Sequence, residues 1–159
     1  MTPRILFILK LRHTYGEYSG VLKSSGLLNS ATFVADALAK AGYITKVVQV
    51  VDNNSIDKEI TAFKPTLAIL EALWVVPSKL DVLKKLHPKV TWIVRLHSKM
   101  PFLANEGIAM HWINDYIRKP KVYLAVNSTE AYNNISHYLK AKQCQKVCLR
   151  NYCIYLISI

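Results

Sequence analysis

Short apolar runs alternate with helical patterns along almost the whole chain of 159 residues. The apolar runs are rich in Ile, Leu and Val, and they predict strands at 4–11, 45–51, 66–74, 90–96, 121–126 and, in part, 146–149. Between them, apolar residues recur at three- and four-residue spacing and predict helices at about 27–41, 56–63, 80–86, 104–118 and 131–139. This alternation is typical of a parallel sheet with helices on both faces.

We therefore expect an α/β domain with a three-layer, doubly wound, Rossmann-like parallel sheet of about six strands. Right-handed crossovers favour the strand order 3-2-1-4-5-6. The length suits a single domain over 1–159, and a content of 52% hydrophobic residues excludes a disordered chain. The longest apolar stretch, 67–77, is interrupted by Glu71 and is shorter than the roughly 18 residues of a membrane span. We expect no membrane span and a cytoplasmic location.

The chain is strongly basic, with 21 Lys and Arg against 10 Asp and Glu and a net charge of +11. Such an excess is typical of contact with nucleic acid, nucleotide phosphates or acidic lipid, although the basic residues are scattered and could form a solvated surface. Three cysteines, Cys144, Cys148 and Cys153, lie near the end without the spacing of a zinc or redox motif. His137 could add a fourth ligand, but we predict no metal site.

Ligands of an open parallel sheet bind beyond the carboxyl ends of the strands, where the strand order reverses. In the predicted order, that point lies between strands one and four, and it selects the loops 12–26 and 97–105. The first loop precedes a helix N-terminus and could bind an anion, or it could be a surface loop. Its glycine spacing matches neither a dinucleotide-binding turn nor a P-loop. Its candidate binding residues are Tyr15, Gly16, Tyr18, Ser24, Ser25 and Gly26.

Three charged or titratable residues outside the first loop are candidate catalytic groups. His97 follows the apolar run VTWIVRL, with Arg95 two residues before it, and could act as a base or bind a sugar hydroxyl. Glu71 stands inside an apolar strand, so it is either a perturbed acid or the partner of a Lys or Arg. Glu106, with Asn105, opens the fourth predicted helix and is either a site residue or a cap. No nucleophile–base motif and no HExxH motif is present.

The order of these segments resembles the N-terminal half of a GT-B-type glycosyltransferase. The likeness covers the glycine-containing loop after strand one, the helix ending AKAGY, the strand TKVVQVV, the stretch ILEALWVVPSKLDVLKKLHPKVTWIVRLHS, and VYLAVNS followed by KVCLRNY. Two segments, 71–77 and 95–107, are also similar to glycosyltransferase-like proteins of phages and bacteria. The resemblance implies that His97 contacts the transferred sugar or the acceptor and that 15–26 faces the donor phosphates. It adds Ser98, Asn127 and Ser128 as substrate-binding candidates, beside Arg95 and Asn105.

The resemblance implies the acceptor-binding half of a nucleotide-sugar-dependent glycosyltransferase. Its ligands would be a glycan acceptor and a nucleotide-sugar donor, with no other cofactor. The segment LRNY resembles the link to a second Rossmann domain, so 150–159 would begin that link. The expected partner is then a second GT-B domain or another copy of the chain. Two alternatives stay open: a basic nucleic-acid-binding module or half of a DNA-modifying transferase, and a non-catalytic protein-interaction module.

Overall fold

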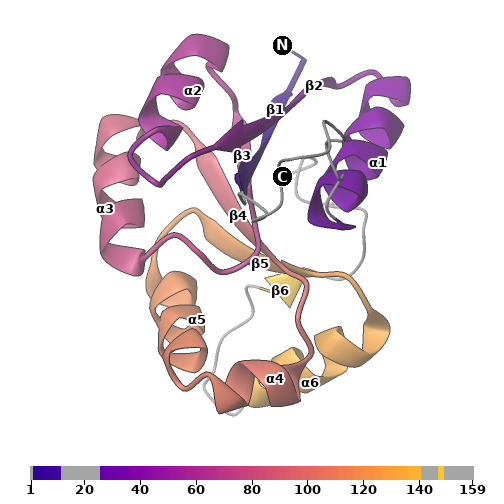
Figure 1. Cartoon of the computed structure of the whole chain (residues 1–159), viewed down its shortest axis with the longest axis vertical. Coiled ribbons are helices and arrows are strands. Elements are labelled where there is room, and N and C mark those ends of the chain that lie inside the picture. The colour runs from indigo at the N-terminus through magenta and orange to yellow at the C-terminus, as the bar shows by residue number, and fades with distance from the viewer. Residues whose placement is uncertain (1, 12–25, 141–146, 149–159) are drawn as a thin grey trace, which may run out of the picture.

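The computed structural model describes residues 2–11, 26–140 and 147–148 (Figure 1). The loop 12–25, including Tyr15 to Ser25, and the proposed link at 150–159 lie outside the described residues, as do Cys144 and Cys153. The elements follow in the order β1 (Arg4–Lys10), α1 (Gly26–Lys40), β2 (Ile44–Val50), α2 (Ile56–Phe63), β3 (Leu67–Glu71), α3 (Pro77–Leu86), β4 (Thr91–Leu96), α4 (Met100–Asn105), α5 (Ile108–Arg118), β5 (Val122–Val126), α6 (Thr129–Lys140) and β6 (Val147–Cys148).

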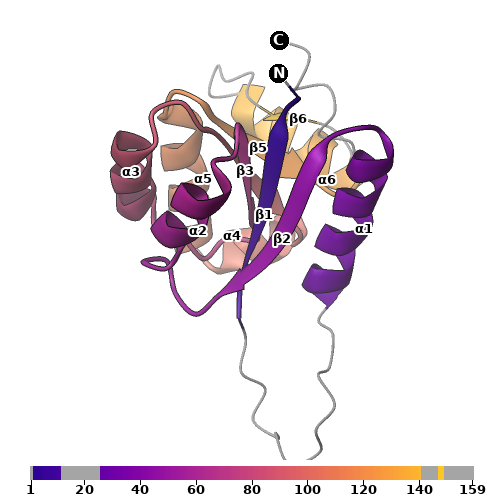
Figure 2. The ribbon, with the colours of Figure 1, turned by 90° about the horizontal axis from the view of Figure 1, so that it is seen from above.

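All strand pairs are parallel, and the sheet has the order β2-β1-β3-β4-β5-β6 (Figure 2). The predicted Rossmann-like parallel α/β fold is confirmed, whereas the predicted order 3-2-1-4-5-6 is wrong. The reason lies in the side chains of two strands. All five residues of β3 are buried, so β3 needs a neighbour on each side. In contrast, β2 exposes Lys46 and Gln49 and lies at the edge.

The helices cover the two faces of the sheet unequally. Figure 2 shows α2, α3 and α5 on one face and α1 on the other. The chain steps from β1 to β2 in one direction and then moves from β3 to β6 in the opposite direction, and right-handed crossovers place the helices of opposite steps on opposite faces. Accordingly, Ala131, Ile135 and Leu139 of α6 join the same core as α2, α3 and α5.

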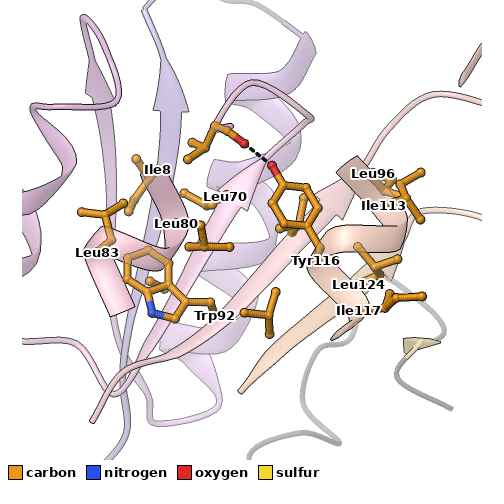
Figure 3. Close-up of a cluster of buried hydrophobic side chains, with 14 of the residues drawn as sticks. Ile8, Leu70, Leu80, Leu83, Trp92, Leu96, Ile113, Tyr116, Ile117 and Leu124 are labelled. Atoms are coloured by element: carbon orange, nitrogen blue, oxygen red, sulfur yellow. Dashed lines mark hydrogen bonds between the residues drawn. The ribbon is translucent and has the colours of Figure 1, made fainter. Parts of the chain in front are cut away.

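The larger core lies between the sheet and this group of helices (Figure 3). Its largest fully buried side chains are Trp92 of β4 and Tyr116 of α5. The Tyr116 hydroxyl donates a hydrogen bond to the carbonyl of Val75, in the loop after β3. Burial raises the pKa of Tyr116 above its usual value. The hydroxyl therefore stays protonated and fixes the β3–α3 loop against α5.

The end of α1 follows the sequence pattern closely. Gly42 adopts a φ of +94°, which only glycine takes without strain. Its N–H donates to the carbonyl of Ala39, while the N–H of Tyr43 reaches back to Leu38 at 3.1 Å. These two bonds form a Schellman motif, which ends the helix.

The helices differ from the prediction in two places. The single helix expected at 104–118 is two helices, α4 and α5, because the chain turns at Gly107 with a φ of +42°. Helix α3 begins earlier than predicted, with Pro77, a residue suited to a first helical turn. In the turn before α2, the carboxylate of Asp52 accepts the N–H groups of Asn54 and Ser55 at 2.8 and 3.0 Å.

Among the described residues, no helix combines the length and the apolar character needed to cross a membrane.

Candidate functional site

The observed strand order moves the reversal point of the sheet. The order reverses between β1 and β3, and not between strands one and four as predicted. The carboxyl ends of β1, β3 and β4 therefore meet at this part of the edge. Two of the candidate residues, Glu71 and Arg95, lie at the ends of β3 and β4, and His97 directly follows β4.

Glu71 and Arg95 form a buried ion pair. They face each other in the β3–β4 register, and their side chains lie on the sheet face that carries α1, as do Ile69 and Ile93. Nη1 of Arg95 donates to Oε1 of Glu71 at 2.9 Å, and the two residues are 2% and 1% exposed. The structure thus identifies the Arg partner that the sequence left open, and the charge of each group is compensated in the interior.

Ser30 of α1 completes the surroundings of the guanidinium. Nη2 of Arg95 donates to Oγ of Ser30 at 2.9 Å. Sequence reasoning missed Ser30, because a half-buried serine inside a helical pattern carries no distinctive signal. The planar guanidinium fits this role, since it presents donors in two directions at once. Arg95 therefore connects β4 to β3 and to α1.

His97 contacts the second carboxylate oxygen of Glu71. Nε2 of His97 lies 2.5 Å from Oε2 of Glu71, and the His97 side chain is 15% exposed. No described residue forms a hydrogen bond with the other ring nitrogen, Nδ1. A carboxylate that accepts Nε2–H fixes the orientation and tautomer of an imidazole. The ring could then accept a proton at Nδ1 from a hydroxyl group.

The backbone directly after Glu71 is strained. Ala72, which follows Glu71, adopts a φ of +70°, a left-handed conformation that costs energy for a residue with a Cβ. Its N–H donates to the carbonyl of Arg95 at 2.9 Å. The turn at Ala72 ends β3, so Glu71 is the last residue of a strand and not an interior one as predicted.

The other described candidates do not join this network. Gly26 is exposed at the start of α1, and Asn127 is exposed after β5. Asn105 ends α4, and Glu106 follows it as an exposed C-cap, so Glu106 does not open a helix as predicted. The remaining two are Ser98, which is half-buried, and Ser128, whose Oγ accepts the N–H of Ala131 at 3.1 Å and caps α6.

Metal ligands do not gather in the part of the chain that the structure describes. Within residues 2–11, 26–140 and 147–148, no group of three His, Cys, Asp or Glu side chains could hold a metal ion. Glu71 and His97 supply only two such groups, and the guanidinium of Arg95 stands beside them.

No protein-family model matches the chain, and no curated protein matches its sequence.

Proposed function

We propose that the chain is the acceptor-binding half of a nucleotide-sugar-dependent glycosyltransferase and that His97 is its general base. The contact between His97 and Glu71 at the carboxyl edge of the parallel sheet carries this proposal. Parallel α/β sheets bind ligands at this edge, near the reversal of strand order. The resemblance of the sequence to GT-B-type glycosyltransferases supplies the reaction class.

The geometry supports a base more than a nucleophile or a structural histidine. Glu71 is engaged by Arg95 through one oxygen, so its charge is held in place while the second oxygen orients the ring. The ring is partly exposed, so a substrate hydroxyl can approach it. An imidazole that is oriented through one nitrogen and reachable at the other suits proton abstraction from a hydroxyl group.

His97 removes the proton of an acceptor hydroxyl as that oxygen forms a bond to the anomeric carbon of the donor sugar. The bond between this carbon and the nucleoside diphosphate breaks, and the diphosphate leaves with the electron pair. Glu71 stabilises the imidazolium formed at His97 and is a positioning residue. The donor would be held mainly by a second lobe, which another domain, a partner or a second copy of the chain would supply.

Ligand-detected NMR on the full chain tests the proposal. The chain is mixed with a panel of nucleotide sugars and of mono- and oligosaccharide acceptors, and saturation transfer and the His97 ring resonances are recorded. We expect saturation transfer to at least one acceptor class, with a shift of the His97 ring signals. His97→Gln, which can still donate to Glu71, is expected to weaken this binding at least five-fold, because it removes the ring that the acceptor hydroxyl contacts.

The matched control is His111→Gln, since His111 is exposed on α5. It should leave binding unchanged. An absence of binding across the panel, or equal losses for the two variants, would overturn the proposal.

A further inference from the structure

Two basic segments that are far apart in the sequence lie together at the amino edge of the sheet. One segment, KKLHPK, spans the end of α3 and the approach to β4, and the other, RKPK, spans the end of α5 and the approach to β5. Nζ of Lys121 donates to the carbonyl of Pro88 at 3.0 Å, and the N–H of Trp92 donates to the carbonyl of Lys121 at 2.9 Å. These bonds hold the two segments side by side.

The cationic side chains of these segments are largely exposed. Lys85, Lys89, Arg118 and Lys121 are all exposed, and Lys64, which precedes the neighbouring strand β3, is exposed as well. We call these five residues the amino-edge patch. Adjacent parallel strands lie about 4.8 Å apart, so the starts of β3, β4 and β5 span about 10 Å. Lys64, Lys89 and Lys121 precede these three strand starts, while Lys85 and Arg118 lie in the last turns of the helices that lead to β4 and β5.

Few negative charges oppose the amino-edge patch. Asp81 is engaged by Lys119 at 2.6 Å, and Asp57 by His87 at 2.6 Å. Asp115, one turn before Arg118, is the exposed carboxylate nearest to it in the chain. Cations are favourable at the C-terminal ends of helices, and this explains part of the clustering of basic residues after α2, α3 and α5. It does not explain Lys89 and Lys121, which lie in the connections beyond those ends.

We infer that the amino-edge patch binds the phosphate backbone of a double-stranded nucleic acid. Clustered Lys and Arg neutralise phosphates without reading sequence. Single-strand binders add exposed aromatic rings for base stacking. Among the described residues, the exposed aromatic side chains are Phe33 and Phe102, on α1 and α4, and neither belongs to the patch. A duplex backbone therefore fits this surface better than a single strand does, and the site is separate from the carboxyl edge with His97.

Fluorescence anisotropy with a labelled 30-base-pair DNA duplex tests the inference. The unmodified chain should bind with an affinity that falls steeply as salt rises. The variant Lys85→Glu/Lys121→Glu should weaken binding at least ten-fold at low salt and reduce the slope of log affinity against log salt by about 2. The matched control is Lys10→Glu/Lys58→Glu, which makes the same change in net charge at exposed lysines of β1 and α2. It should weaken binding less than three-fold.

Further measurements separate the alternatives. Equal losses for the two double variants would overturn the inference, since the net charge of the chain would then explain binding. An absence of binding to the duplex would overturn it as well. Leu86 is exposed next to Lys85, so anionic phosphatidylserine vesicles are tested in parallel. Patch-dependent binding to vesicles without binding to DNA would also overturn it. Superimposable circular dichroism spectra establish that each variant is folded, and His97→Gln should leave duplex affinity unchanged.

Discussion

Nε2 of His97 lies 2.5 Å from Oε2 of Glu71, whose other oxygen accepts a hydrogen bond from Arg95 at 2.9 Å. One carboxylate therefore binds both a buried guanidinium and a partly exposed imidazole. Because Glu71 and Arg95 face each other in the register of β3 and β4, the orientation of His97 depends on the pairing of these strands.

Replacing the carboxylate should be costly for stability. Glu71→Gln keeps the shape of the side chain but leaves Arg95 buried without a counter-charge, and we expect the free energy of unfolding to fall by about 3 kcal/mol. Urea denaturation measures this change. The control is Glu130→Gln, which removes the exposed partner of Lys99 and should cost less than about 1 kcal/mol. A loss for Glu71→Gln no larger than that of the control would contradict a structural charge pair.

Removing the Cβ of Ala72 should not destabilise the protein. Its φ of +70° is strained for alanine, and glycine releases about 1–2 kcal/mol of strain while adding about 0.5–1 kcal/mol of unfolded-state entropy. We expect Ala72→Gly to be neutral or to stabilise by up to about 1 kcal/mol. The same exchange at Ala37, an exposed residue inside α1, should destabilise by about 1 kcal/mol. Thermal and urea unfolding of the two variants compare these effects, and equal destabilisation would refute the strain at Ala72.

The hydroxyl of Tyr116 should contribute measurably to stability. Tyr116→Phe leaves the carbonyl of Val75 without this donor in the core, and we expect a loss of about 1–3 kcal/mol. Tyr132→Phe is the control, because Tyr132 is half-buried and its hydroxyl has no hydrogen-bond partner among the described residues. It should change stability by less than about 0.5 kcal/mol. Chemical denaturation of the three proteins is the measurement, and indistinguishable midpoints would disprove the role of this bond.

Asp52 should make stability depend on pH in the acid range. The N–H of Ser55, and then that of Asn54, donate to its carboxylate and lower its pKa below 3.8. The ionised form is thus favoured in the folded state, so its stabilisation is present above pH 3.8 and is lost as the pH falls through the lower folded value. The stability difference between the unmodified chain and Asp52→Asn should therefore shrink on acidification. Unfolding at pH 7 and below pH 3 measures it, with Asp36→Asn, an exposed site on α1, as the control. A difference that is constant with pH would refute the assignment.

Local patterns predicted most of the elements. The run RILFILK and the helix ending AKAGY gave the correct type and nearly the correct ends, because apolar periodicity and the Gly42 turn act within a few residues. The strand order needs a comparison between distant segments. The exposed Lys46 and Gln49 of β2 favour an edge position, and the fully buried β3 needs a neighbour on each side, whereas the commonest topology assigns these two positions the other way round.

The candidate site was predicted in part. His97 and Arg95 were selected for their position at the end of a strand, and Glu71 because a carboxylate in an apolar run needs a partner. Their mutual contact could not be predicted, since it depends on the register of β3 against β4. Ser30 was missed because its neighbour is 65 residues away in the chain. The amino-edge patch was missed for the same reason.

Arg95 also limits what evolution or engineering can place at this position. Its side chain reaches a carboxylate on β3 and a hydroxyl on α1, and its own carbonyl receives the N–H of Ala72. A lysine carries the same charge but ends in a single ammonium, which cannot extend a flat, two-pronged group toward both elements. The exchange Arg95→Lys would thus keep electroneutrality while uncoupling the helix from the two strands, so charge alone is not an adequate guide to tolerated replacements here.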